Sequence, residues 1–273
     1  MKGHSPLLIS RNNPKVKQIR RLRQRKWRDE TGLFVIEGIR HIGEAAQAGM
    51  QIDSLYFAPD LLSNAYAQEL LQQQQDRGVP CLALDAQTFS SLADKENPQG
   101  ILAVVRKPVW TLDQLHPGNF PWGVALVSPQ DPGNIGTILR TIDAVGASGL
   151  LLLENSADPY HPSAVRASMG SLSWYPVVQA SFTDFLKWSN RLAYRLYGTS
   201  AHGGSDYRQV EQYSFPLILL MGSEREGLSS DQRQACDFLL SLPMHGKATS
   251  LNLAVATGVM LYAIEQAKIA LTG

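Results

Sequence analysis

Several short runs of this chain are apolar at every position, and this feature constrains the fold most. The clearest are Val124–Val127, Leu150–Leu153 and Leu217–Met221. None of them alternates apolar with polar residues, as a strand with one solvent-facing side would. Strands buried on both faces are typical of parallel sheets covered by helices. A helical apolar spacing over Asn134–Val145 separates the first two runs. The sequence therefore predicts an α/β fold with a parallel sheet.

Strands and helices alternate in two series, separated by a stretch rich in Pro, Gly and polar residues. The 273 residues suffice for one large or two ordinary domains. We expect a basic N-terminal arm, a small α/β domain, a linker and a larger α/β domain, over residues 1–30, 31–105, 106–121 and 122–273.

Basic residues gather at the N-terminal end. Residues 1–30 hold ten of the 25 Lys and Arg residues and two of the 24 acidic ones, although the net charge of the whole chain is only +1. This asymmetry favours binding to phosphates, with Arg20, Arg23 and Lys26 as expected contacts and Trp27 as a base-stacking candidate. The alternative is a solvated helix face.

An apolar stripe runs through the same basic segment. Asn13 and Pro14 predict a helix start near Lys15. Val16, Ile19 and Leu22 then share one side of that helix. The arm is therefore expected to dock on the protein by this side and to face nucleic acid with the other.

Composition favours a protein without a metal or a membrane partner. Cys81 and Cys236 are far apart in apolar surroundings, which predicts buried free thiols in a reducing compartment. No Cys/His cluster has metal-ligand spacing. No apolar run approaches the length of a membrane span, so we expect a cytoplasmic protein.

Three segments carry the candidate chemistry. The first, Asp131–Arg140, follows a predicted strand and opens a helix that bears Asn134 and Arg140. An arginine there suits a phosphate, although a surface Arg with an Asn N-cap is the ordinary alternative. The second, Met221–Leu228, has glycines that let the backbone approach a ligand, and Glu224 at the carboxyl end of a strand.

The third segment runs from Leu242 to Asn252, where a short strand passes through a Pro/Gly turn into a long apolar helix pattern, Leu251–Leu271. Ser250 is a natural N-cap for that helix. The unpaired amides of a helix start also suit polar or anionic ligands. Neither this segment nor the second matches a Walker A loop or a dinucleotide fingerprint.

The order of these three segments resembles the SpoU (TrmH) family of the SPOUT methyltransferases, over roughly residues 122–268. Ala164–Gly170 is similar to the family's substrate-side loop, with Arg166 and Ser168 as expected substrate contacts. The N-terminal series resembles an L30e-like RNA-binding domain. The resemblance implies a parallel-sheet α/β-knot catalytic domain whose C-terminal part threads into a trefoil knot. It also implies a homodimer that forms through this C-terminal domain.

The resemblance also implies S-adenosylmethionine as the cofactor and a ribose 2′-hydroxyl of RNA as the methyl acceptor, with rRNA favoured over tRNA. The implied catalytic residues are Asn134, Arg140, Glu224, Ser250 and Asn252. The implied cofactor contacts are Thr199, Gly222, Leu242 and Leu251. Arg140 is expected to act as the base or, because an arginine stays protonated, as a phosphate clamp. A tRNA substrate, methylation of a base, and a non-catalytic RNA-binding protein with the same fold stay open as alternatives.

Overall fold

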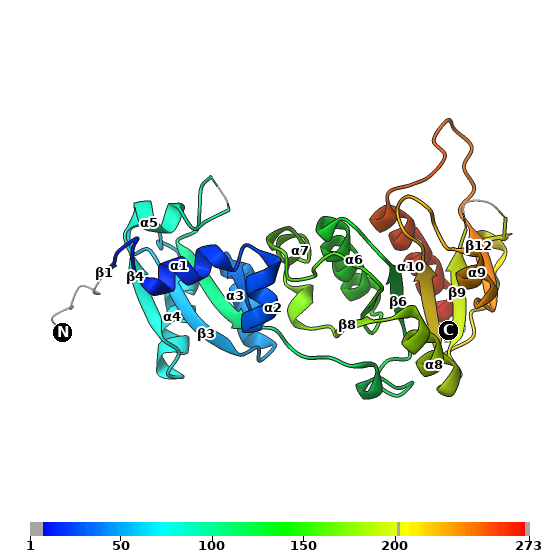
Figure 1. Ribbon diagram of the computed structural model, residues 1–273, viewed down its shortest axis with the longest axis horizontal. Helices are drawn as coiled ribbons and strands as arrows, with labels where there is room; N and C mark the ends of the chain where they lie inside the picture. The colour runs from blue at the N-terminus through cyan, green and yellow to red at the C-terminus, as the bar shows by residue number, and fades with distance from the viewer. Residues whose placement is uncertain (1–7, 95, 201–202, 271–273) are drawn as a thin grey trace. The chain divides into compact units, whose positions relative to one another are not determined.

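The computed structural model describes residues 8–94, 96–200 and 203–270, which divide into two compact units (Figure 1). The first unit contains residues up to Pro108 together with Tyr160–Trp174, and the second contains Val109–Pro159 and the chain from Tyr175 onward. The predicted second domain, 122–273, includes Tyr160–Trp174, so the structure groups these residues differently. Leu271, the predicted end of the last helix, lies outside the described residues.

The described part of the first unit combines a mixed sheet with helices. Its order along the chain is β1 (Leu8–Ile9), α1 (Pro14–Arg21), α2 (Arg25–Thr31), β2 (Leu33–Glu37), α3 (Ile39–Gln47), β3 (Ile52–Phe57), α4 (Ala65–Asp76), β4 (Cys81–Leu84), α5 (Ala86–Ser90), β5 (Ile101–Arg106), and later α7 (Pro162–Ala167) and the 3-10 turn η2 (Ser171–Ser173). The sheet order is β1-β4-β3-β5-β2, in which β5 runs antiparallel to both of its neighbours.

Helix α1 forms where Asn13 and Pro14 predict it. The Asn13 side chain accepts a hydrogen bond from the amide of Lys15 at 2.9 Å, and Pro14 occupies the first turn, where no amide donor is needed. Val16 and Ile19 on α1 are buried, and Leu22 at its C-cap is buried with them against the sheet. The predicted apolar stripe is therefore confirmed as part of the core of the first unit.

One basic residue of the N-terminal segment serves the fold. Arg28 on α2 is buried, and its Nη1 donates to the carbonyls of Leu22 and Arg23 at 2.7 and 2.8 Å. These carbonyls follow α1 and have no partner within the helix, so the guanidinium satisfies acceptors that the helix end leaves open. Arg28 thus joins α1 to α2 and is not part of a solvated face.

The second unit is built on a parallel sheet, as predicted. Its order along the chain is η1 (Leu112–Gln114), β6 (Trp122–Val127), α6 (Pro132–Val145), β7 (Leu150–Leu153), β8 (Val177–Ala180), α8 (Phe182–Arg191), β9 (Arg195–Thr199), β10 (Ser205–Asp206), η3 (Tyr207–Gln209), β11 (Leu217–Met221), α9 (Ser230–Gln234), β12 (Phe238–Ser241) and α10 (Leu253–Ala270). Within the described residues the strand order is β10-β12-β9-β11-β6-β7-β8, and every pair is parallel.

The apolar runs form the centre of this sheet. β6, β7 and β11 are buried along their whole length, which explains their lack of alternation. Strand β11 lies between β6 and β9, so the chain moves outward from β6 to β8 and then returns to the other side of β6. Such a reversal of direction leaves a crevice at the carboxyl ends of the strands, which is the usual ligand position in open α/β sheets.

Candidate active site

The predicted chemistry-bearing segments all follow strands that end at one edge of the second sheet. Asn134 lies in the helix after β6, Thr199 ends β9, Gly222 follows β11, and Leu242 follows β12. These strands are neighbours in the sheet and run parallel, so their carboxyl ends meet at the same edge. Segments more than 100 residues apart in the chain are thereby brought to one place.

Three of the five predicted catalytic residues form one hydrogen-bonded chain. Asn252 Nδ2 donates to Asn134 Oδ1 at 3.0 Å, and Asn134 Nδ2 donates to Glu224 Oε1 at 3.3 Å. The Glu224 carboxylate also accepts from the amide of Gln130, at 3.2 Å to Oε2. The orientation of both side-chain amides is fixed, because the Glu224 carboxylate at one end of this hydrogen-bonded chain can only accept hydrogen bonds. The network therefore links the first, second and third chemistry-bearing segments.

The sequence reading of Asn134 as an ordinary helix cap does not hold. Helix α6 begins earlier, with Asp131 as N-cap accepting from the amide of Gly133 at 2.7 Å and with Pro132 in the first turn. Asn134 lies inside the helix and is buried. Its side-chain amide is therefore available for the network with Glu224 and Asn252.

The predicted N-cap of the last helix is also corrected. Asn252, not Ser250, caps α10: Asn252 Oδ1 accepts from the amides of Ala254 and Val255 at 2.8 and 3.3 Å. The helix starts at Leu253, two residues after the predicted start. Both residue types are good caps, so local sequence does not distinguish them. Asn252 thus has two roles, because its carbonyl caps the helix while its amino group holds Asn134.

The predicted cofactor contacts line a single cavity of about 320 Å³ in the second unit. This volume lies in the range of small-molecule sites. Its walls include all four of these residues and two of the predicted catalytic ones: Thr199, Gly222, Leu242, Leu251, Glu224 and Ser250. Ser250 and Leu251 are exposed at this wall, so polar and apolar groups both face the cavity.

Gly222 is held where no larger residue fits. A Cβ at this position would lie 2.1 Å from the carbonyl carbon of Gly227 and 2.4 Å from the amide nitrogen of Leu228. Both contacts are to backbone, which cannot move aside as a flexible side chain would. The loop closes further through hydrogen bonds between Ser223 and Gly227 in both directions. This closed turn brings bare backbone to the cavity wall, as the glycines of the segment predict.

Some residues that line the cavity were not predicted from the sequence, among them Met221, Met244 and Arg233. Arg233 Nη1 donates to the carbonyl of Leu228 at 2.8 Å. Met221 was detectable, because it is the last residue of a buried strand that precedes a predicted ligand loop. Arg233 carries no such signal, since it belongs to the short helix α9 in a stretch that reads as ordinary surface.

Arg140 stands apart from the hydrogen-bonded chain. It is exposed on α6, six residues beyond Asn134, which is about 9 Å along the axis of a helix. No ion pair or hydrogen bond joins its guanidinium to any residue in the described ranges. An exposed, uncompensated guanidinium on the helix that also carries Asn134 is available to an anionic partner.

The predicted substrate contacts belong to the first unit, and several of them have protein partners. Arg20 donates to Ser91 Oγ at 3.1 Å, Arg23 forms an ion pair with Asp94 at 2.9 Å, and Lys26 lies 3.8 Å from Glu30. Ser168 is buried, with its hydroxyl donating to the carbonyl of Val165 at 2.8 Å. Arg166 is exposed and lines a cleft with Arg23.

Cys236 in the second unit is partly buried and packs against the core. Burial, with a smaller contribution from Asp237, raises the pKa of Cys236 to about 11. Its thiol therefore stays protonated at neutral pH and is a poor nucleophile. Cys81 and Cys236 are both free.

Over the described ranges, no group of three His, Cys, Asp or Glu side chains could hold a metal ion. Within the same ranges, none of the helices has the length and apolar character of a membrane span.

Two protein families match different parts of the chain. The SpoU rRNA Methylase family matches residues 121–262, which include the cavity and the hydrogen-bonded chain. The MRM3-like substrate binding domain matches residues 13–103, which lie in the first unit.

Curated relatives match over nearly the whole chain. The 23S rRNA (uridine(2479)-2'-O)-methyltransferase of Streptomyces viridochromogenes is 35% identical over 248 residues, covering 88% of this chain and 85% of the relative. The 23S rRNA (guanosine(2553)-2'-O)-methyltransferase RlmP of Bacillus subtilis is 31% identical over 261 residues, covering 93% and 96%.

Solved structures agree with these relatives. An AdoMet-bound rRNA methyltransferase from Sinorhizobium meliloti has a TM-score of 0.87 at 36% identity, covering 95% of this chain and 97% of the other. The SpoU methyltransferase AviRb from Streptomyces viridochromogenes, in complex with the cofactor AdoMet, has a TM-score of 0.85 at 32% identity, covering 95% and 99%. The resemblance in the three segments is therefore confirmed over the full fold, and the chain belongs to the SpoU rRNA Methylase family.

Proposed function

We propose that this protein transfers a methyl group from S-adenosylmethionine to a ribose 2′-hydroxyl of rRNA. The observation that carries the proposal is the hydrogen-bonded chain Asn252–Asn134–Glu224, because Glu224 belongs both to this chain and to the wall of the cofactor-sized cavity. The curated relatives are named as 23S rRNA 2'-O-methyltransferases, which favours rRNA over tRNA.

The cavity fits S-adenosylmethionine in its chemistry. Leu242 and Leu251 supply apolar surface for the adenine, while the bare backbone at Gly222 allows close approach and amide contacts. Thr199 and Ser250 supply hydroxyls for the polar parts of the molecule. When bound, this cofactor supplies a methyl group already activated by a sulfonium charge.

The remaining task of the protein is to align and activate the acceptor hydroxyl. Glu224 and Asn134 hold each other in fixed orientations, so they are suited to position groups at the cavity rim. We assign Arg140 the role of a clamp on the phosphate beside the target ribose, since a guanidinium matches phosphate oxygens and stays charged. From that position it also stabilises negative charge that develops on the attacking oxygen.

We assign RNA capture to the first unit. The exposed basic residues of α1 and α2 supply contacts to the RNA backbone, and Arg166 belongs to the family's substrate-side loop. Of the predicted contacts, Arg20, Arg23 and Lys26 already have protein partners, so their contribution to RNA binding requires exchange of those partners.

The proposal extends to assembly and location. Val255 and Tyr262 on α10 are 53% and 54% exposed, and apolar side chains of this size on one helix suit a second copy of the chain. We propose a homodimer through the second unit, a trefoil knot in its C-terminal part as in the family, and action in the cytoplasm.

Methylation mapping tests the function. RNA from cells with and without the gene is hydrolysed with alkali, because a 2′-O-methyl group protects the adjacent phosphodiester bond from cleavage. The expected result is one protected site in rRNA that disappears with the gene. A protected site in tRNA selects the tRNA alternative, and a methylated base without protection refutes ribose methylation. Purified protein that binds no S-adenosylmethionine in calorimetry identifies a non-catalytic protein.

A further inference from the structure

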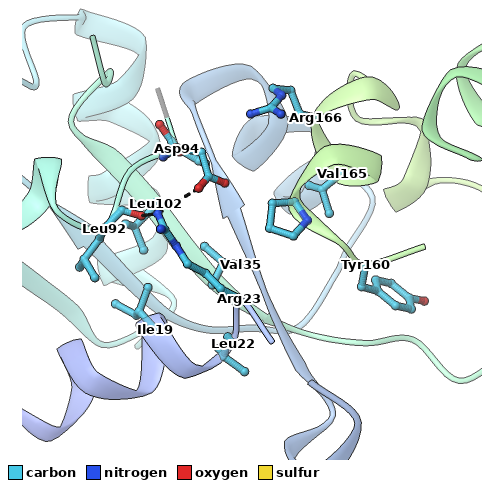
Figure 2. Close-up of a pocket in the computed structure, with 12 residues that line it drawn as sticks. Ile19, Leu22, Arg23, Val35, Leu92, Asp94, Leu102, Tyr160, Val165 and Arg166 are labelled. Carbon is cyan, nitrogen blue, oxygen red and sulfur yellow. Dashed lines mark hydrogen bonds and ion pairs between the residues drawn. The ribbon is translucent and has the colours of Figure 1, made fainter. Parts of the chain in front are cut away.

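An open pocket in the first unit is lined by α3, by the start of α4 and by the segment before β5. Its volume is about 290 Å³, close to the lower end of the range for small-molecule sites. The lining residues that matter here are polar or aromatic: Arg40, Glu44, Gln47, Asn64, Tyr66 and Gln99. None of them belongs to the cleft that Arg23 and Arg166 line, which Figure 2 shows, so the two sites are distinct.

Tyr66 supplies an aromatic surface at this pocket. Its side chain reaches α3 at Gly43, where an added Cβ would lie 2.6 Å from the Tyr66 hydroxyl oxygen. The ring fits there because α3 carries no side chain at that position. Tyr66 is nevertheless 46% exposed, and its hydroxyl has no hydrogen-bond partner among the described residues. An exposed aromatic ring beside a pocket is a platform on which an unpaired base can stack.

Two side-chain amides that line the pocket have fixed orientations. Asn64 Oδ1 accepts from the amide of Ala67 at 3.2 Å, as the N-cap of α4. Gln99 Oε1 accepts from the amide of Ile39 at 3.0 Å, at the start of α3. The amino groups of Asn64 and Gln99 have no acceptor in the part of the chain that the structure describes. Both residues therefore have donors available for a ligand that is rich in oxygen atoms.

Arg40 is the cationic group of the pocket. The Glu44 carboxylate that faces it is already engaged, because its Oε2 accepts from Trp174 Nε1 at 2.8 Å. Glu44 Oε1 lies 4.0 Å from Arg40 Nε, and the Arg40 side chain is 67% exposed. An ion pair at this distance and exposure is weak. The other guanidinium nitrogens of Arg40 are therefore available to phosphate oxygens.

We propose that this pocket binds one unpaired nucleotide of the RNA substrate, with its base stacked on Tyr66 and its phosphate at Arg40. This inference rests on the proposed action on RNA. The amino groups of Asn64 and Gln99 donate to oxygen atoms of the same nucleotide. A base inside a duplex has both faces covered by its neighbours, so the stack selects a single-stranded nucleotide. Because every base has an aromatic face, the pocket recognises the lack of pairing and not the identity of the base.

Photocrosslinking locates the RNA on the full-length protein. The probe is an oligouridylate of about ten nucleotides, a length that one single-strand site accommodates, in which 5-iodouridine replaces uridine. On irradiation this base forms a covalent bond with an aromatic side chain that it contacts. We expect peptide mass spectrometry to find the crosslink at Tyr66. A crosslinked protein in which Tyr66 is unmodified, for example with the RNA joined only to Trp27, overturns the proposal.

Substitutions measure the stack. Tyr66→Ala is expected to weaken binding of a fluorescently labelled oligouridylate about tenfold, the loss that follows removal of one base–aromatic contact. Tyr66→Phe keeps the ring and should bind within about twofold of the wild type. Gln72→Ala, an exposed residue of α4 that does not line the pocket, is the control. Wild-type affinity in Tyr66→Ala, or an equal loss in Tyr66→Phe, overturns the proposal.

Arg40→Gln tests the phosphate contact separately. It should lower the slope of log K against log salt for the same single strand by about 0.7, the contribution of one phosphate contact. Tyr66→Ala should leave this slope unchanged, because stacking neutralises no phosphate. Arg77→Gln, exposed at the C-cap of α4, is the matched control. A wild-type slope in Arg40→Gln refutes the phosphate contact at this pocket.

The test is separable from the proposed function. Binding and crosslinking are measured without S-adenosylmethionine, so a crosslink at Tyr66 stands even if the protein transfers no methyl group. Conversely, a protein that binds the cofactor and methylates rRNA, yet loses no RNA affinity in Tyr66→Ala, refutes the pocket alone. Cofactor affinity of Tyr66→Ala, measured by calorimetry, is expected to equal that of the wild type.

Discussion

The side chain of Asn252 donates to that of Asn134 at 3.0 Å, although the two residues are 118 positions apart in the chain. The same side chain caps α10 through its oxygen. One amide therefore couples the start of the last helix to the hydrogen-bonded chain that ends at Glu224. A change at Asn252 affects stability and chemistry through different atoms, and these effects can be separated.

Asn252→Asp is expected to reduce activity without loss of stability. An aspartate retains the oxygen that caps α10, and a negative charge at a helix start is favourable. It has no N–H to donate to Asn134, so we expect methyl transfer to fall at least about tenfold, as for loss of one positioned hydrogen-bond donor. Thermal unfolding and a methyl-transfer assay measure the two effects.

Asn252→Ala serves as the matched comparison, because it removes both the cap and the donor. Loss of a cap costs about 1 kcal/mol, which lowers Tm by about 2–4 °C in a protein of this size. An Asn252→Asp protein with wild-type turnover would show that the contact to Asn134 has no part in catalysis.

Gly222→Ala is expected to destroy the cofactor cavity wall. The added methyl group would meet backbone atoms of Gly227 and Leu228, and such overpacking costs about 1–3 kcal/mol. We expect affinity for S-adenosylmethionine, measured by calorimetry, to fall at least about tenfold, because 1.4 kcal/mol corresponds to one factor of ten.

Gly246→Ala is the control for this change. It lies in the loop between β12 and α10, where a Cβ would meet no atom within 4 Å and the φ angle is an ordinary one. We expect its cofactor affinity to match the wild type. Equal losses in the two variants would mean that the result reflects loop flexibility and not the close approach at Gly222.

The parallel sheet of the second unit was predictable because its central strands are buried on both sides. The run Leu217–Met221 is a strand with the same bounds as the prediction, since burial forces every residue in it to be apolar. The ends of the last helix were harder to predict. Ser250 and Asn252 are equally good caps by type, and only the contact with distant Asn134 distinguishes them.

Long-range packing explains what local patterns could not show. Tyr160–Trp174 lies between two strands of the second unit in sequence but clusters with the first unit. Tyr160 packs on Phe34 with ring centroids 4.8 Å apart, and Trp174 Nε1 donates to Glu44 at 2.8 Å. Neither contact leaves a periodic signal. The sequence also could not show that Glu37 Oε1 is buried without a hydrogen-bond partner among the described residues, because this depends on which side chains surround it.

Arg140→Ala is expected to remove most turnover and to spare the cofactor. Arg140 does not line the cavity, so affinity for S-adenosylmethionine should stay within about twofold of the wild type. Loss of an electrostatic contact to the reacting groups should reduce kcat by about 100-fold or more. Arg191→Ala, an exposed arginine of the same unit paired with Asp113, is the control. A near wild-type rate for Arg140→Ala refutes its assignment.

Both cysteines are expected to resist alkylation in the folded protein. Burial raises the pKa of Cys81 and of Cys236 to about 11. At pH 8 the thiolate fraction of each is then about 100-fold below that of an unfolded cysteine with a pKa near 9. Iodoacetamide labelling followed by mass spectrometry, with and without denaturant, measures the difference. Rapid labelling of both native thiols would contradict it.

The same pKa shifts set the direction of a pH effect on stability. Because the folded state keeps protons that the unfolded state loses above pH 9, the free energy of unfolding should decrease as pH rises from about 9 to 11. The contribution is fully present below pH 9. Replacing both cysteines with alanine should flatten this part of the curve of stability against pH.

Charge on the exposed side of α1 is expected to control the salt dependence of RNA binding. Lys15, Lys17 and Arg21 are exposed, and Arg21 lies 4.7 Å from the ring centre of Trp27. Changing all three to Gln should lower the slope of log K against log salt for single-stranded RNA by about 2, since each phosphate contact contributes about 0.7. Removing residues 1–30 is a poorer test, because it also removes Val16, Ile19 and Leu22 from the core.

Two single variants complete that test. Arg77→Gln, exposed at the end of α4, should leave the salt slope unchanged. Arg28→Gln should lower Tm instead, because buried Arg28 satisfies the carbonyls of Leu22 and Arg23. If the triple variant binds RNA with the wild-type slope, the basic residues of α1 form only a solvated face, and the RNA contacts of the first unit must lie elsewhere.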